Sequence, residues 1–223
     1  MSWESSAVYY RLINEGVRER LGGLHSADLL LRSVDFADVA ALQHASDWDA
    51  LGVMLAGEAH ALAAAGARTI VLCTNTMHCV ADAIEEAAGV PLLHIADATG
   101  TALVQAGVTR VGLLGTAFTM EQPFYRERLR TRFALDVIVP PADARAAVHR
   151  IIYDELVRGE VRDESRSTYR AVMAALVTEG AQAIVLGCTE IGLLVGADDA
   201  TVPLFDTTIL HAAAAVEAML AGR

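Results

Sequence analysis

The segment from Ala183 to Glu190 reads Ala-Ile-Val-Leu-Gly-Cys-Thr-Glu and places a short apolar run before a cysteine. An earlier segment, from Thr69 to Asn75, reads Thr-Ile-Val-Leu-Cys-Thr-Asn and follows the same plan. Apolar runs of this length, rich in β-branched residues, predict strands that are buried on both faces, as in a parallel sheet. Because ligands bind beyond the carboxyl ends of such strands, we expect each cysteine to lie at a potential site.

The two segments belong to a longer internal repeat. Six positions of the first copy recur 114 positions later: Leu62, Gly66, Ala67, Ile70, Val71 and Leu72 match Leu176, Gly180, Ala181, Ile184, Val185 and Leu186. A Val-Pro-Leu triplet at residues 90–92 recurs at residues 202–204. Helical periodicity over residues 47–65 and 163–179 precedes the two runs, with a glycine as the helix stop in each case. Strands that alternate with helices predict parallel sheets.

The repeat predicts an α/β fold with two pseudo-symmetric lobes. Each lobe should be a mostly parallel sheet flanked by helices, with the active site in the cleft between the lobes. We expect a first α/β lobe over residues 1–98 and a second over residues 99–205. Residues 206–223 are expected to pack back onto the first lobe.

The opening of the second half has no complete counterpart in the first. Residues 111–116 (Val-Gly-Leu-Leu-Gly-Thr) predict a strand and a turn, and the helix that follows contains Tyr125. The counterpart of Tyr125 is Tyr10, 115 positions earlier, so the equivalent strand would precede Met1. We therefore expect the first lobe, in the sequence as given, to lack its opening strand, a central one. A start codon assigned late or a removed segment would explain this.

The composition excludes several kinds of function. With 28 acidic and 17 basic residues the net charge is −11, which disfavours binding to nucleic acid or to an anionic membrane surface. All basic residues are arginine, so neither a lysine Schiff base to pyridoxal phosphate nor a Walker A lysine is available. Three cysteines and the lack of a long apolar run predict a cytoplasmic protein with reduced thiols.

Two thiols at equivalent places suggest proton transfer at carbon. If the two strand ends face each other, a planar carbanion bound between them meets one thiol on each face. Removal of a proton from one face and its return to the other is racemisation. Cys73 and Cys188 suit the roles of acid and base, because a free cysteine has a pKa of about 8.5 that its surroundings readily change.

The residues around both cysteines resemble the paired signatures of the aspartate/glutamate racemase family. The similarity lies in Cys73-Thr74-Asn75-Thr76-Met77-His78 and Gly187-Cys188-Thr189-Glu190-Ile191, and it extends to residues 1–5, 33–36 and 114–120. It implies a cofactor-independent isomerase, an amino-acid racemase that interconverts L- and D-aspartate or glutamate, with Cys73 and Cys188 as the acid/base pair. It also implies no metal, and a homodimer as the assembly.

The resemblance further implies a set of substrate-binding residues. Matching positions hold the α-carboxylate and the amino group or position the thiols: Met1, Gln43, Thr74, Asn75, Thr76, Thr116, Thr119, Thr189 and Glu190. Some aspartate-specific members bind the side-chain carboxylate with an arginine and a lysine. Because lysine is absent here, the candidates for that role are Arg32, Arg158 and Arg166.

Other interpretations of the same residues stay open. Cys73, His78 and Cys79 could suggest a metal site, but their spacing is not that of a common zinc motif, and we interpret Cys79 as a core residue. A related cysteine-dependent isomerase, of the maleate isomerase or hydantoin racemase type, would use the same architecture. The expected loss of a strand instead favours a non-catalytic paralogue that binds a small dicarboxylate.

Overall fold

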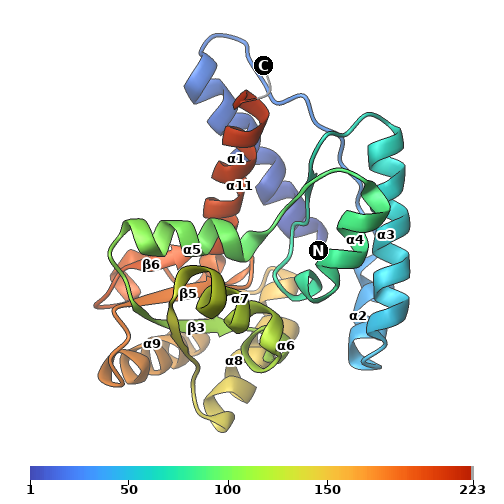
Figure 1. Ribbon diagram of the computed structural model, residues 1–223. Helices are drawn as coiled ribbons and strands as arrows, with labels where there is room; N and C mark the ends of the chain where they lie inside the picture. The colour runs from blue at the N-terminus through green and yellow to red at the C-terminus, as the bar shows by residue number, and fades with distance from the viewer. Residues whose placement is uncertain (222–223) are drawn as a thin grey trace. The chain divides into compact units, whose positions relative to one another are not determined.

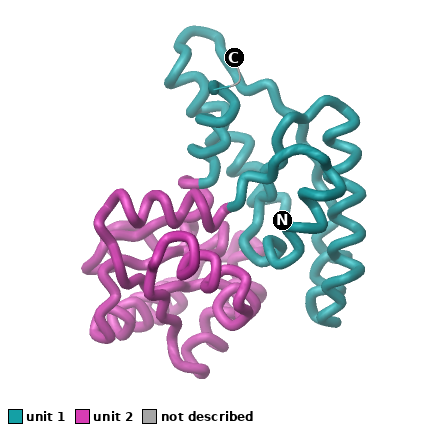
Figure 2. The backbone as a smooth tube through the Cα atoms, in the orientation of Figure 1, with its two compact units in different colours: residues 1–94, 211–223 teal, residues 95–210 magenta. Residues whose placement is uncertain are grey.

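A computed structural model describes residues 1–221, and the chain forms two compact units (Figures 1 and 2). Unit 1 contains residues 1–94 and the chain from residue 211 onward, and unit 2 contains residues 95–210. Of the expected segment 206–223, residues 222–223 lie outside the described part of the chain. The predicted α/β class, with two lobes and parallel sheets, is confirmed.

Unit 2 is built around a four-stranded parallel sheet with the strand order β4-β3-β5-β6. Its elements are α5 (Ile95–Gln105), β3 (Arg110–Gly115), α6 (Ala117–Glu121), α7 (Pro123–Phe133), β4 (Asp136–Ile138), α8 (Ala142–Asp154), η2 (Leu156–Arg158), α9 (Asp163–Thr178), β5 (Ala183–Gly187), α10 (Ile191–Leu194), η3 (Ala197–Asp199) and β6 (Leu204–Asp206). The central strands β3 and β5 pair from Val111 opposite Ala183 to Gly115 opposite Gly187.

Side chains of β5 alternate between the two faces of this sheet, as in any strand. Ile184 and Leu186 pack in a core with α8 and α9, whereas Ala183 and Val185 pack in a second core with α5 and α7. Helices therefore cover both faces of the strand, which explains why its sequence is apolar throughout.

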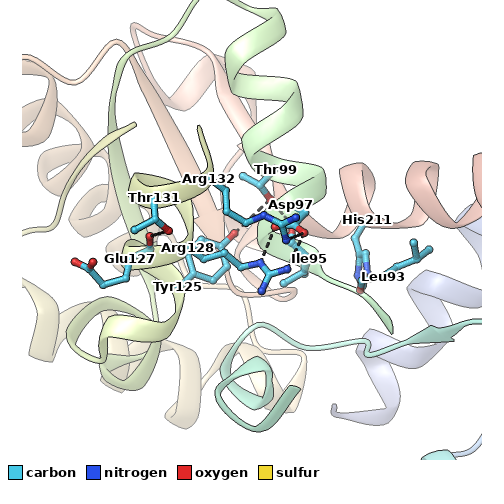
Figure 3. Close-up of polar contacts among 10 residues, drawn as sticks. All are labelled: Leu93, Ile95, Asp97, Thr99, Tyr125, Glu127, Arg128, Thr131, Arg132 and His211. Carbon is cyan, nitrogen blue, oxygen red and sulfur yellow. Dashed lines mark hydrogen bonds and ion pairs between the residues drawn. The ribbon is translucent and has the colours of Figure 1, made fainter. Parts of the chain in front are cut away.

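Polar contacts join α5 to α7 on one face of the sheet (Figure 3). Asp97 accepts hydrogen bonds from Nε and Nη2 of Arg128, at 2.6 and 2.8 Å, and from Nη1 of Arg132 at 2.7 Å. Deeper in the core, the Tyr125 hydroxyl donates to Oγ1 of Thr99 at 3.3 Å. These contacts fix α7 against α5 where both helices cover the strands.

Unit 1 has a smaller sheet. Its elements are α1 (Trp3–Leu21), α2 (Phe36–His44), α3 (Trp48–Ala64), β1 (Ile70–Val71), η1 (Thr76–Val80), α4 (Ala81–Ala88), β2 (Leu92–Leu93) and, from His211 onward, α11 (Thr207–Ala221). β1 pairs in parallel with β2, with Ile70 opposite Leu92 and Val71 opposite Leu93. Within residues 1–221, β2 is the only strand that pairs with β1.

Two apolar clusters cover the sheet of unit 1. Ile70 and Leu72 pack with α3 and α4, while Val71 and Cys73 pack with α1 and α11. The helices α1 and α11, blue and red in Figure 1, lie side by side although they come from opposite ends of the chain. None of the helices within residues 1–221 is long and apolar enough to cross a membrane.

The two units repeat each other in local detail. The helices α3 and α9 end shortly before Gly66 and Gly180, whose φ angles of 103° and 97° lie in the region that glycine favours. The main-chain N–H groups of Ile70 and Ile184 donate to the proline carbonyls of the two Val-Pro-Leu triplets, at 2.9 and 3.0 Å. The sequence repeat therefore corresponds to a repeat in strand pairing.

Candidate active site

Cys73 lies just beyond β1, where the chain turns toward η1. The turn forms because Thr74 N donates to Leu72 O at 2.7 Å. The thiol is half-buried, with Sγ 3.6 Å from Val71 O. Burial raises the pKa of Cys73 to about 11, and the positive charge of the amino terminus acts in the opposite direction. At neutral pH Cys73 is therefore a thiol in the ligand-free protein.

Unit 1 gathers its predicted site residues around this turn. The Met1 ammonium donates to Cys73 O at 2.6 Å. The buried amide of Gln43, on α2, places Nε2 at 3.1 Å from Sδ of Met77 in η1. Three buried polar residues follow the thiol: Thr74, Asn75 and Thr76.

Cys188 directly follows β5 and is hydrogen-bonded to an acidic side chain. Its Sγ donates to Oε2 of Glu190 at 3.1 Å, and the Thr189 hydroxyl donates to the same oxygen at 2.6 Å. Cys188 and Glu190 are both buried. Burial, and then the negative charge of Glu190, raise the pKa of Cys188 well above its usual value. At neutral pH Cys188 is therefore a thiol, like Cys73, and it can ionise only with the help of a base or of a nearby positive charge.

Thr116 and Thr119 form a buried hydroxyl pair at the end of β3. Thr116 is the N-cap of α6, its Oγ1 accepts from Thr119 N at 3.3 Å, and the two hydroxyls lie 3.2 Å apart. Unit 1 has the same motif 114 positions earlier: Ser2 caps α1, Ser2 Oγ accepts from Ser5 N at 3.1 Å, and the hydroxyls are 3.0 Å apart. The repeat distance of 114 positions would have identified Ser2 and Ser5 as the counterparts of Thr116 and Thr119, but the sequence analysis did not name them.

The sequence analysis also did not predict a cluster of buried histidines in unit 1. The rings of His78 and His94 are 4.4 Å apart, and those of His78 and His211 are 5.9 Å apart. His211 bonds through Nδ1 to the Tyr9 hydroxyl at 2.9 Å and through Nε2 to Leu93 O at 2.7 Å. Burial lowers the pKa of His211 to about 4 and, with the charges of the two neighbouring histidines, lowers the pKa of His78 further below its usual value. All three histidines belong to unit 1, and Nδ1 of His78 lies 2.8 Å from Thr74 O in the turn after Cys73.

Two candidates for binding a side-chain carboxylate already have carboxylate partners in their own units. Arg32 pairs with Glu58 through Nε and Nη2, at 2.5 and 2.9 Å. Arg166 lies 3.8 Å from Asp199. Arg158 is exposed at the end of η2. A substrate carboxylate would have to compete with Glu58 or Asp199 for the first two.

The cysteine and histidines near η1 do not form a metal site. Cys79 packs partly buried against the α3–α4 cluster, and burial raises its pKa to about 11. Across residues 1–221, no group of three or more His, Cys, Asp or Glu side chains is arranged to hold a metal ion.

Comparison with known proteins identifies the family. The model of the Asp/Glu/hydantoin racemase family matches residues 1–215. A candidate Asp/Glu racemase from Yersinia pestis is 53% identical, with a TM-score of 0.92 over 99% of this chain and 96% of that one. An aspartate racemase homologue from Pyrococcus horikoshii OT3 is 31% identical, with a TM-score of 0.83 over 97% and 94%. The Picrophilus torridus aspartate racemase, 19% identical with a TM-score of 0.71 over 96% and 89%, shares the fold. The chain belongs to the Asp/Glu/hydantoin racemase family of isomerases.

Proposed function

We propose that the protein racemises aspartate or glutamate without pyridoxal phosphate: one of Cys73 and Cys188 removes the Cα proton, and the other delivers a proton to the opposite face of Cα. The observation that carries the proposal is the equivalence of the two thiols. Each follows the equivalent parallel strand of its unit, β1 or β5, and each unit carries a hydroxyl-capped turn of the same geometry. Two equivalent acid–base groups are what inversion at a carbon atom requires.

In one direction, a Cys73 thiolate takes the proton from Cα, so that an S–H bond forms as the C–H bond breaks. The electron pair left on Cα is delocalised into the α-carboxylate. The Cys188 thiol then gives its proton to the opposite face of Cα and becomes the thiolate. The opposite enantiomer reacts with the two roles exchanged, and no electrons are lost or gained overall.

Glu190 is the residue that distinguishes the two thiols. The Cys188–Glu190 hydrogen bond holds one proton between a sulfur and a carboxylate oxygen 3.1 Å apart, so the pair shares one negative charge. We propose that a substrate ammonium placed beside Glu190 compensates that charge and assists ionisation of Cys188. The hydroxyl of Thr189 keeps Oε2 oriented toward the thiol.

The remaining site residues are proposed to bind the substrate's polar groups. Hydroxyl and amide donors suit a carboxylate, which accepts several hydrogen bonds at once. The proposed set is Met1, Gln43, Thr74, Asn75 and Thr76 from unit 1, with Thr116, Thr119 and Thr189 from unit 2. Aspartate is the preferred substrate of the proposal, because the 31% identical Pyrococcus protein is described as an aspartate racemase homologue. A cytoplasmic homodimer is the proposed working form.

The decisive experiment follows hydrogen at Cα in deuterated water. With two bases, each D-aspartate molecule formed from L-aspartate at early times carries solvent deuterium, while unreacted substrate keeps its proton. Cys73→Ser and Cys188→Ser should each abolish racemisation. Cys79→Ser is the matched control and should remain active, because this third cysteine packs in the core of unit 1.

Four results would contradict the proposal. Retention of the original Cα hydrogen in the product indicates a single base. A fully active Cys73→Ser or Cys188→Ser variant removes that thiol from the mechanism. Conversion of maleate or a hydantoin, with no turnover of aspartate or glutamate, would make the protein one of the other cysteine-dependent isomerases. Calorimetric binding of aspartate without any isotope exchange would indicate a non-catalytic binding protein.

A further inference from the structure

The hydroxyl of Tyr169 is a polar group in an apolar core. Tyr169 lies on α9 and is fully buried in the core that α8 and α9 form with β5. Among residues 1–221, no group forms a hydrogen bond with its hydroxyl oxygen. Buried hydroxyls almost always have a partner, because their desolvation otherwise costs free energy. The hydroxyl is explained if a neighbouring group becomes a strong acceptor in another state of the protein.

The direction of α9 brings Tyr169 to the level of Cys188. A Cβ atom at Gly112 would lie 2.9 Å from Cδ1 of Leu176 and 2.8 Å from Cδ1 of Ile184, so these two side chains lie at one level of the sheet. The short turn between α9 and β5 reverses the chain, so the helix runs antiparallel to the strand. Tyr169 precedes Leu176 by seven residues, about 10 Å along the helix. Cys188 follows Ile184 by four residues, about 13 Å along the strand.

Cys188 also lies on the face of the sheet that α9 covers. Ile184, Leu186 and Cys188 occupy alternate positions along the chain, and side chains two residues apart point to the same face. All three belong to the core cluster that contains Tyr169. The thiol and the hydroxyl are therefore neighbours in level and in face.

Unit 1 has a leucine where unit 2 has this hydroxyl. The repeat of 114 positions pairs Tyr169 with Leu55, which is buried on α3. It pairs Cys73 with Gly187 and not with Cys188, and a shift of one residue turns a side chain to the other face. Cys73 accordingly packs with α1 and α11 and not with α3. The hydroxyl is present only in the unit whose thiol faces this helix.

The ionisable side chains near this hydroxyl are Cys188, Glu155 and Glu190. Burial, and then the charges that these groups carry when ionised, raise the pKa of Tyr169 well above its usual value, so the hydroxyl keeps its proton and can donate it. Glu155 already accepts from the hydroxyl of Ser165 at 2.6 Å. Glu190 already accepts from the Cys188 thiol at 3.1 Å. The sulfur of Cys188 becomes a strong acceptor only when it loses its proton.

We propose that the Tyr169 hydroxyl donates a hydrogen bond to the Cys188 thiolate and so stabilises the ionised form of that residue. A donor of this kind favours the charged form over the neutral thiol. In the racemisation it acts whenever Cys188 is a thiolate, before it takes the Cα proton in one direction and after it has given its proton in the other. This catalytic role rests on the proposed function, whereas the hydrogen bond itself does not.

The test compares Tyr169→Phe with Tyr125→Phe. Each substitution removes one buried hydroxyl from unit 2, but Tyr125 packs in the core that contains α5 and α7, and its hydroxyl donates to Oγ1 of Thr99. Alkylation by iodoacetamide at pH 8 is followed by mass spectrometry of the peptides that contain Cys188 and Cys73. Calorimetry gives the melting temperature of each variant.

Tyr169→Phe should slow the alkylation of Cys188 about threefold or more and leave that of Cys73 unchanged. Loss of a hydrogen bond to an ion lowers the thiolate fraction about tenfold or more, and the greater nucleophilicity of the remaining thiolate offsets part of this loss. The melting temperature should stay the same or rise, because an unpartnered hydroxyl leaves the core. Tyr125→Phe should instead lower the melting temperature and leave both alkylation rates unchanged.

The value of kcat/KM for racemisation should also fall about threefold or more in Tyr169→Phe, for both enantiomers. The proposal is overturned if Cys188 reacts equally fast in Tyr169→Phe and in the parent chain, or if Tyr125→Phe slows it as much. A melting temperature that falls as far in Tyr169→Phe as in Tyr125→Phe would also overturn it, because the hydroxyl would then have a partner in the ligand-free protein. A chain that racemises no amino acid, but whose Cys188 reacts more slowly in Tyr169→Phe, contradicts the proposed function and supports the hydrogen bond.

Discussion

His211 is held as one neutral tautomer in the core of unit 1, so its protonation should destabilise that unit. Leu93 O can only accept, which places the ring proton on Nε2, and Nδ1 then accepts from the Tyr9 hydroxyl. A second proton would put a donor where Nδ1 accepts and a charge beside the ring of His78. Burial accordingly lowers the pKa of His211 to about 4, against about 6.5 in an unfolded chain.

The sign and size of the effect follow from this difference. Because the pKa is lower in the folded state, the unfolded state binds the proton first, and stability falls as the pH drops from about 6.5 toward 4. A shift from about 6.5 to about 4 corresponds to a loss of about 2 kcal/mol at pH 5 and about 3 kcal/mol at pH 4, relative to neutral pH. Below pH 4 both states bind the proton, and the loss reaches its limit.

The assay compares urea unfolding of unit 1, by tryptophan fluorescence, at several pH values between 7 and 4. His211→Gln replaces the ring with an amide that can still donate to Leu93 O and accept from Tyr9, but cannot titrate. Its free energy of unfolding should fall by about 2 kcal/mol less than that of the parent chain between pH 7 and pH 5. His25→Gln is the matched control, because His25 is exposed in the same unit.

The assay compares how the free energy of unfolding changes with pH. A loss of stability in His211→Gln that is the same at every pH therefore does not affect the comparison. If the parent chain and His211→Gln lose stability in parallel between pH 7 and pH 4, the buried tautomer does not control acid stability and the reasoning is refuted. A flattened slope in His25→Gln would refute it as well.

Three further substitutions test unit 2. Glu190→Gln removes the carboxylate charge and should lower the pKa of Cys188, measured as faster iodoacetamide alkylation of its peptide at pH 8; an unchanged rate contradicts this. Gly100→Ala should destabilise by about 1–3 kcal/mol in calorimetry, although alanine favours helices, because its Cβ would clash with the ring of Phe133. Asp97→Asn should cost about 1 kcal/mol, less at high salt, and a salt-independent loss would show that packing and not charge is affected.

The sequence was sufficient to predict the elements that depend on local pattern. An apolar run before each cysteine predicted β1 and β5, and the alternation of strands with helices predicted that both would lie in parallel sheets. The run at Thr69–Leu72 predicts a longer strand than the observed Ile70–Val71, because a strand is assigned by its pairing and β2 supplies partners for only two residues. The apolar character of the run is explained by the two helical layers around it.

Contacts between distant parts of the chain could not be predicted in the same way. His211 and Leu93 are 118 positions apart, and no periodicity links them. The cluster forms because α11 packs beside α1 and brings His211 to Tyr9 and to the end of β2. Ser2 and Ser5 differ from this case. Their equivalence to Thr116 and Thr119 follows from the repeat distance, but a search for identical residues does not find it, because serine in one half corresponds to threonine in the other.

The repeat also shows where the two halves of the candidate site differ. The residue two positions after the thiol is Glu190 in unit 2 and Asn75 in unit 1, so only Cys188 has a carboxylate as its hydrogen-bond acceptor. The pKa of Cys188 is raised by that carboxylate in addition to burial, whereas the amino terminus opposes the effect of burial on the pKa of Cys73. Identical thiols on equivalent strands therefore have neighbouring charges of opposite sign. Both cysteines are thiols at neutral pH, but the acidic neighbour adds to the stability of the thiol at Cys188, whereas the ammonium acts in favour of the thiolate at Cys73.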